Sequence, residues 1–242
     1  DVLVRNNTRV LPARLFAHRA DTGGNMEFLL LKRTGEKTWE CLARPARRAI
    51  VGREYVVNEE LGIRVLGDTD ADGGKQIELL YDGIFEEVLD RAGQMPLPPY
   101  ITERLNDKNR YQTVYALTNG SAAAPTAGLH FTNELLAKIK DQGTDIVDVL
   151  LHVGLGTFRP VAEDKIEDHV MHKEYYEVSP EAAERINLAR QKGGRIVAVG
   201  TTSCRTLESV TTEAGIVQSG KDWTGIYITP GYRFRAVDAL IT

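Results

Sequence analysis

Cysteine is scarce in this 242-residue chain, which contains only Cys41 and Cys204, far apart and in unrelated local contexts. These two residues form no disulfide framework and no Cys-x-x-Cys metal knuckle, and a reducing compartment fits them best. Long apolar runs are also absent, because stretches such as 149–151 and 196–199 are soon interrupted, far short of the ~20 residues that cross a bilayer. We therefore expect a cytoplasmic protein with no membrane contact.

The chain also lacks a large excess of either charge. It has 30 Lys and Arg residues against 34 Asp and Glu residues, and the formal net charge of −4 excludes a uniformly basic coat for nucleic acid. Residues 1–53 nevertheless hold 11 basic and only 5 acidic side chains. Within this basic segment, Arg44, Arg47, Arg48 and Arg53 form a candidate docking face for RNA phosphates, with an ordinary solvated surface as the alternative.

The first third of the chain has the pattern of short strands separated by turns. Gly-containing turns at 21–24 and 72–74 separate apolar runs at 10–16, 27–31, 39–42, 55–57, 63–66 and 76–81. Many short strands without a long helix predict a small antiparallel β-barrel over residues 10–83.

Beyond residue 83 the pattern becomes helical until the proline-rich run 95–99, which marks a domain boundary because proline lacks an amide donor. Helices and strands then alternate. We expect a helix over 133–140, a strand over 146–153, a helix that Ser179 caps and Pro180 opens, and a strand over 195–199. This alternation predicts a mixed α/β fold with a larger layered α/β domain.

Histidine is concentrated in this second domain, which contains His130, His152, His169 and His172, whereas His18 is isolated. Single histidines often pack in a core or point to water, and that alternative stays open for each of them. A metal cluster with His169-x-x-His172 as one arm is a further alternative. Because this spacing matches no strong zinc pattern, we expect no metal.

Three loops rich in glycine and hydroxyl groups lie where an α/β sheet places ligands. Small residues let a backbone approach a ligand closely, and the loop at 199–208 joins a strand to a helix whose free amides suit an anion. The alternatives are ordinary tight loops and a hydroxyl that only caps its own helix. The candidate binding residues are Pro125, Thr126 and Gly128, then His152, Gly154, Thr157 and Arg159, then Thr201, Thr202, Ser203 and Arg205.

Eight motifs occur in an order that resembles one known family. They are NNTRVLPARL (6–15), YDGIFEEVLDRAGQMPLPPYI (81–101), YQTVYA (111–116), AAPTAGLHFT (123–132), LHVGLGTFRPV (151–161), HVMHKEYY (169–176), VGTTSCRTLE (199–208) and PGYRF (230–234). Together they resemble the S-adenosylmethionine:tRNA ribosyltransferase-isomerase family of the queuosine pathway. Three positions depart from the family pattern: Asn7 replaces a usual Asp, Thr229 a common Tyr, and Cys204 a usual Val or Thr.

The resemblance implies an enzyme that transfers and isomerises the ribosyl group of S-adenosylmethionine onto 7-aminomethyl-7-deazaguanine at the tRNA wobble position. The products are epoxyqueuosine, adenine and methionine. The resemblance also implies that residues 1–9 and 84–242 form the α/β catalytic domain, into which the barrel is inserted. The family pattern continues beyond both ends, so we expect this chain to be a piece of a longer enzyme, and we expect a monomer.

Ribosyl transfer from a sulfonium needs a base for a carbon-bound proton, assistance as adenine departs, and a site for the methionine carboxylate. From the resemblance, His130 or His172 transfers protons, and Glu174 orients a histidine or holds the substrate ammonium. His152 and Thr157 line the donor pocket. Amides of residues 201–203 hold the carboxylate, helped by Arg205 or Arg159.

Three other functions stay open: a conventional methyltransferase, a metal-dependent hydrolase and a noncatalytic RNA-binding module. Their products and requirements differ. A methyltransferase leaves S-adenosylhomocysteine, a metal-dependent hydrolase fails with chelator, and a binding module leaves S-adenosylmethionine intact.

Overall fold

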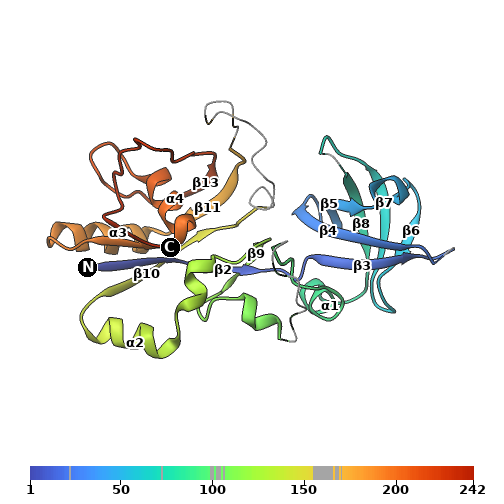
Figure 1. The fold of residues 1–242 in the computed structure, drawn as a ribbon, viewed down its shortest axis with the longest axis horizontal. Coiled ribbons are helices and arrows are strands. Elements are labelled where there is room, and N and C mark those ends of the chain that lie inside the picture. Colours follow the sequence, from blue (N-terminus) through green and yellow to red (C-terminus); the bar gives the residue numbers. More distant parts are fainter. Residues whose placement is uncertain are drawn as a thin grey trace. The chain divides into compact units, whose positions relative to one another are not determined.

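The computed structural model describes residues 1–21, 23–71, 73–98, 101, 105, 107–154, 166, 169 and 171–242. The chain divides into two compact units, Leu11–Ile101 on one side and Asp1–Val10 with Thr102–Thr242 on the other. Figure 1 shows both units along the chain. Across the described residues, no helix combines the length and apolar character needed to span a bilayer.

The unit of residues 11–101 is a closed six-stranded barrel in which every pairing is antiparallel. Side chains alternate between its interior and the solvent, as in β4, where Met26, Phe28 and Leu30 are buried and their neighbours are not. The barrel predicted from the strand pattern is therefore confirmed. Its strands, in spatial order, are β3 (Arg14–Arg19), β4 (Asn25–Arg33), β5 (Thr38–Arg44), β8 (Gly74–Leu80), β7 (Gly62–Asp68) and β6 (Glu54–Val56).

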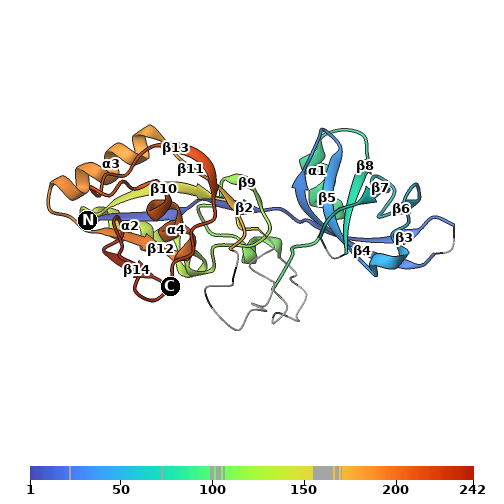
Figure 2. The same cartoon turned by 90° about the horizontal axis from the view of Figure 1, so that it is seen from above.

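Helix α1 (Phe85–Ala92) belongs to the barrel unit (Figure 2). Phe85, Val88 and Leu89 are buried in the same apolar cluster as the barrel strands. The ring of Phe85 lies 5.4 Å from that of Trp39. The barrel unit of the structure thus extends beyond residue 83 to Ile101, and it includes α1 because the apolar stripe of this helix packs against the barrel.

The other unit is built on a six-stranded sheet with the spatial order β13-β11-β10-β1-β12-β14. Strands β10, β1, β12 and β14 are parallel to one another. At one side of the sheet, β11 is antiparallel to both of its neighbours, β10 and β13. The predicted layered α/β architecture is confirmed. The strands are β1 (Val2–Asn6), β10 (Asp145–Leu151), β11 (Glu174–Val178), β12 (Ile196–Val199), β13 (Gly220–Thr224) and β14 (Ala239–Ile241).

Helices cover both faces of this sheet. In Figure 1, α3 (Pro180–Gln191) and α4 (Gly200–Val210) lie on one face and α2 (Asn133–Asp141) on the other. Successive side chains of β1 point to opposite faces of the sheet, which explains this arrangement. Val2 and Val4 pack with α3 and α4, and Leu3 packs with α2. The predicted cap is present, since Ser179 Oγ accepts a hydrogen bond from the amide of Ala182 at 3.1 Å.

Short elements complete this unit beside the sheet. The apolar run expected at 10–16 divides here, because Val10 ends β2 in one unit and Arg14 begins β3 in the other. The short elements are the parallel pair β2 (Thr8–Val10) and β9 (Thr118–Ser121), and the 3₁₀ turns η2 (Lys108–Tyr111) and η3 (Thr126–His130). In the barrel unit, η1 (Ala46–Arg48) follows β5.

Candidate active site

Several of the predicted site residues lie at one edge of the six-stranded sheet, whereas Pro125, Thr126, Gly128 and His130 follow β9 of the two-stranded sheet. Strand β1 ends at Asn6, β10 at Leu151 and β12 at Val199, and their parallel register places these ends side by side. Because β11 and β13 are antiparallel, β11 begins and β13 ends at the same edge, where Glu174 pairs with Thr224. The carboxyl edge of a parallel sheet is where such folds bind ligands.

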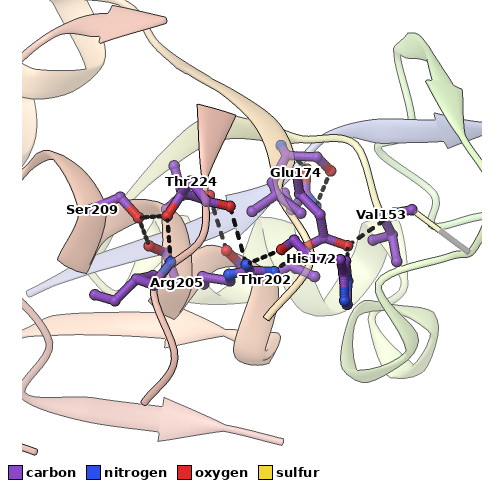
Figure 3. Close-up of polar contacts among 12 residues, drawn as sticks. Val153, His172, Glu174, Thr202, Arg205, Ser209 and Thr224 are labelled. Carbon is purple, nitrogen blue, oxygen red and sulfur yellow. Dashed lines mark hydrogen bonds and ion pairs between the residues drawn. The ribbon is translucent and has the colours of Figure 1, made fainter. Parts of the chain in front are cut away.

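A buried ion pair between Glu174 and Arg205 lies at this edge (Figure 3). The Glu174 side chain is 4% exposed and that of Arg205 is 9% exposed. Arg205 Nη1 donates to Glu174 Oε2, while Nη2 donates to the carbonyls of His172 at 2.8 Å and Thr224 at 3.1 Å. Burial lowers the pKa of Arg205 and the Glu174 charge opposes that shift, but a guanidinium stays protonated in either case.

The second oxygen of Glu174 holds His172. Glu174 Oε1 accepts a hydrogen bond from the Gly154 amide at 2.9 Å and lies 3.2 Å from His172 Nε2. Because an ionised carboxylate only accepts hydrogen bonds, this contact places the proton on Nε2 and leaves the Nδ1 lone pair available. The His172 side chain is 30% exposed. A fixed imidazole with an open basic nitrogen can accept a proton from a ligand.

His152 occupies a second position at the edge. Its Nδ1 lies 2.8 Å from Thr8 Oγ1, and burial lowers its pKa, with a smaller opposing effect of Glu177. Gly120 has a φ of +147°, and a Cβ there would lie 2.6 Å from His152 Nε2, so only glycine leaves room for this ring. His152 is therefore a neutral, closely packed imidazole at pH 7.

Asn6, at the end of β1, was missed by the sequence analysis, whereas the adjacent Asn7 was noted there as a departure from the family pattern. Asn6 Oδ1 accepts from the amides of Leu151 at 3.0 Å and Thr8 at 3.1 Å, and its Nδ2 donates to the Leu151 carbonyl at 2.9 Å. Asn6 therefore fixes the strand end that positions His152. Asn7, which replaces the family's usual Asp, has a buried Oδ1 without a hydrogen-bond partner in the described part of the chain.

The amino terminus of α4 carries the third predicted loop. Its N-cap residue is Val199, and no side chain caps the helix, so a hydroxyl that caps its own helix is not what this segment contains. Thr202 Oγ1 and Ser203 Oγ are buried and have no hydrogen-bond partner among the described residues. Thr201 is exposed. The first turn of α4 thus combines unsatisfied amides with two unsatisfied hydroxyls.

The turn η3 lies against this helix terminus. A Cβ on Gly200 would lie 3.7 Å from Ala127 Cβ. Gly128, which follows Ala127 in the turn, is buried, and a side chain at this position would clash with the Tyr115 hydroxyl. Pro125 is the residue before this turn, and both Thr126 and His130 are exposed.

The structure therefore joins His172, Glu174, Gly154 and Arg205 in one network of hydrogen bonds. It joins His152 to Thr8 instead. Among the described residues, His130 forms no hydrogen bond with this network, and His169 lies 5.2 Å from the Tyr227 ring. Thr157 and Arg159 lie outside the described residues. Within the described ranges, no group of three or more His, Cys, Asp or Glu residues is arranged to hold a metal.

Comparison with known proteins decides which family this is. A family model described as queuosine biosynthesis protein matches residues 1–242. The chain belongs to this family. Curated relatives from Thermoanaerobacter sp. (strain X514) and Clostridioides difficile (strain 630), both named S-adenosylmethionine:tRNA ribosyltransferase-isomerase, are 57% identical over all of this chain, which spans 71% of their length.

A solved relative was also found. The crystal structure of S-adenosylmethionine tRNA ribosyltransferase from Thermotoga maritima is 31% identical in sequence. The match covers 99% of this chain and 65% of that chain, with a TM-score of 0.39.

Glu208, the last residue of the motif at 199–208, has a structural role that the sequence analysis did not predict. It is fully buried and accepts hydrogen bonds from the amides of Arg235, Ala236 and Val237 and from the Tyr232 hydroxyl. Glu208 therefore fastens the segment after the PGYRF motif to helix α4. The two motifs are far apart in sequence, so only the fold reveals this contact.

Proposed function

We propose that this chain transfers and isomerises the ribosyl group of S-adenosylmethionine onto 7-aminomethyl-7-deazaguanine in tRNA, and that His172 is its proton-transfer residue. Family membership and the names of the curated relatives support a tRNA ribosyltransferase-isomerase of queuosine biosynthesis. The residue assignment is supported by the hydrogen bond between His172 and Glu174. The carboxylate of Glu174 is in turn paired with the Arg205 guanidinium. The products are epoxyqueuosine, adenine and methionine.

His172 performs the proton transfer through Nδ1. A sulfonium acidifies the hydrogens on the carbon beside it, and His172 removes one as the ribosyl carbon becomes nucleophilic. Glu174 then stabilises the imidazolium that forms, and the ion pair with Arg205 holds Glu174 in place inside the fold. His130, exposed on η3, is the second candidate for proton transfer to the departing adenine.

The methionine carboxylate binds at the first turn of α4. The first turn of α4 follows β12 at this edge of the sheet, and the hydroxyls of Thr202 and Ser203 lack other partners in the described structure. Both Nη atoms of Arg205 already donate within the protein, so Arg205 acts on the site through Glu174. Arg159 is the remaining cation proposed to contact the carboxylate.

The donor pocket is completed by residues of the other two loops. His152 and Gly154 follow β10 at the same edge, and the turn η3 lies against the start of α4. S-adenosylmethionine is a co-substrate in this proposal, and no metal takes part. We further propose that the protein acts as a monomer in the cytoplasm and that the residues lining this pocket are Pro125, Thr126, Gly128, His152, Gly154 and Thr157.

The barrel is proposed to dock the tRNA backbone. Arg44, Arg47 and Arg48 are exposed around η1, and none forms an ion pair with another described residue. Arg53, by contrast, pairs with Asp21 at 3.1 Å. Three uncompensated guanidinium groups on a short exposed segment attract phosphates, and their contribution weakens as salt rises.

Chromatography of the reaction products tests the activity. S-adenosylmethionine is incubated with the protein and tRNA carrying 7-aminomethyl-7-deazaguanine, and we expect adenine and methionine to appear only when this tRNA is present. S-adenosylhomocysteine would instead identify a methyltransferase, and loss of activity with chelator would identify a metal-dependent enzyme. An intact co-substrate with tightly bound tRNA would identify a binding module.

A further inference from the structure

Thr8 and His152 form a side-chain pair outside the network that holds His172. Thr8 lies two residues beyond the end of β1, His152 follows the end of β10, and Thr8 Oγ1 lies 2.8 Å from His152 Nδ1. Thr8 is fully buried, and its amide donates to Asn6 Oδ1 at 3.1 Å. Both partners are therefore held by neighbouring strands that end at the same edge of the sheet.

The burial of Thr8 decides which nitrogen of His152 carries the proton. Within the described residues, His152 Nδ1 is the only hydrogen-bond partner of the Thr8 hydroxyl. A hydroxyl has one hydrogen to donate, and in this buried position Nδ1 is the acceptor that satisfies it. The proton of the neutral imidazole is thus assigned to Nε2. His152 presents an N–H donor, whereas His172 presents a lone pair.

Nε2 of His152 is available to a ligand. Across the described part of the chain, no group is hydrogen-bonded to this nitrogen. Gly120 lies next to it, is exposed, and has no side chain to cover this edge of the ring. The ring of Tyr175 stacks on the imidazole at 6.0 Å and 22°, so it contacts the face of the ring. His152 is therefore fixed at Nδ1 and on one face, and open at Nε2.

The surroundings keep this imidazole uncharged. Burial lowers the pKa of His152, and the nearby Glu177 opposes that shift only in part. A neutral imidazole that donates a hydrogen bond stabilises negative charge as it develops on a reacting group. This chemistry suits an uncharged heterocycle that gains charge during the reaction. A carboxylate, which is charged from the start, is better served by the amides of α4.

We propose that His152 is a catalytic residue that donates a hydrogen bond from Nε2 to a ring nitrogen of the adenine of S-adenosylmethionine, and that Thr8 is its positioning residue. This inference rests on the proposed function. As adenine departs, the bond between ribose C1′ and adenine N9 breaks and its electron pair goes to the adenine ring. N3 and N7 share that charge, and the hydrogen bond from His152 stabilises it. The proton that completes adenine comes from the solvent, so His152 stays neutral throughout.

The placement of the two imidazoles agrees with two separate tasks. His172 is proposed to act on the carbon beside the sulfonium, and adenine leaves from C1′, at the other end of the same sugar. His152 follows β10 at the same edge of the sheet, and the amide of Gly154, two residues on, donates to Glu174 at 2.9 Å. No hydrogen bond among the described residues joins His152 to His172, so the two rings are free to act on different atoms.

Two substitutions of His152 separate the roles of its two nitrogens. A Gln amide extends about as far as Nε2 and can donate to adenine, whereas an Asn amide ends near Nδ1 and reaches only Thr8. With tRNA carrying 7-aminomethyl-7-deazaguanine, we expect kcat for adenine release to fall about 10²- to 10³-fold in His152→Asn and to recover about tenfold in His152→Gln. Near-wild-type kcat in His152→Asn, or equal losses in the two variants, overturns the inference.

Thr8→Val and Thr8→Ser test the positioning role without changing the imidazole. Valine has the shape of threonine but no hydroxyl, so nothing holds the proton on Nε2, and kcat is expected to fall about 5- to 10-fold. Serine keeps the hydroxyl and should restore most of this loss. Wild-type kcat in Thr8→Val overturns the role of Thr8.

Analogues of S-adenosylmethionine whose adenine lacks N3 or N7 test the contact in the wild-type protein, without turnover. They are titrated in the presence of an anticodon stem-loop with an unmodified wobble guanine, which has no amine to react. We expect wild type to bind one of the two analogues about 2- to 10-fold more weakly than S-adenosylmethionine, and His152→Asn to bind all three equally. Equal affinities in wild type overturn the inference.

Two further outcomes separate the alternatives. A raised KM for RNA in His152→Asn, with unchanged discrimination among the three donors, overturns the inference and assigns His152 to the RNA base. Wild-type protein that discriminates among the donors but releases no adenine with the modified tRNA contradicts the proposed function and leaves the contact with adenine standing.

Discussion

The two units of this chain fill their interiors differently. In the barrel the buried side chains of the described residues are apolar except for Lys75, whereas the sheet unit buries Asn6, Ser203, Glu174, Arg205 and several further polar residues. A closed barrel pairs its backbone groups within itself and leaves its interior to apolar packing. The open sheet ends its parallel strands at one edge, and the polar groups gather there. The interior of the barrel is therefore almost entirely apolar, and the buried polar groups to which the proposed function assigns the chemistry lie in the sheet unit.

Ion pairs give the largest expected contrast. Glu174→Ala leaves the Arg205 guanidinium buried without its partner and is expected to lower the free energy of unfolding by about 3–5 kcal/mol. Glu54→Ala in the barrel removes a partner of the exposed Arg64 and should leave the midpoint of urea denaturation nearly unchanged. Equal effects of the two substitutions would remove the distinction between the units.

Apolar packing gives the converse contrast. Leu79 is fully buried in the barrel, and Leu79→Ala is expected to lower the free energy of unfolding by about 2–5 kcal/mol. Because Leu79 packs within the barrel's own apolar cluster, kcat per folded molecule should stay at the wild-type value. Turnover is measured well below the denaturation midpoint, and a large drop in kcat would show that the barrel core takes part in catalysis.

The pH dependence of stability gives the smallest effect. Burial holds the folded-state pKa of His152 below its usual 6.5, so the unfolded chain takes up a proton first as pH falls. Stability is therefore expected to decline below pH 6.5, and His152→Asn should flatten that decline in denaturation series. The hydrogen bond from Arg185 lowers the pKa of Asp145 below 3.8. The contribution of Asp145 to stability is therefore lost only at more acidic pH than that of His152. An unchanged slope in His152→Asn would show that burial does not shift the titration of this ring.

Much of the fold could be predicted because its signals are local. Short apolar runs separated by glycine-containing turns indicated the barrel strands, and Ser179 with Pro180 marked the start of α3. The pairing of Glu174 with a histidine was suggested by the family resemblance. The contact of Glu174 with Arg205 was not, because these residues lie on a strand and a helix that meet only in the folded sheet. The same reason hid the roles of Asn6 and Glu208.

Turnover of His172→Ala tests the central claim most directly. Adenine release is measured with tRNA carrying 7-aminomethyl-7-deazaguanine, beside His18→Ala, which removes an exposed histidine from the barrel. We expect kcat to fall by about 10²- to 10⁴-fold in His172→Ala and to stay unchanged in His18→Ala. Near-wild-type turnover of His172→Ala would contradict the account, because the imidazole held by Glu174 would then have no part in the reaction.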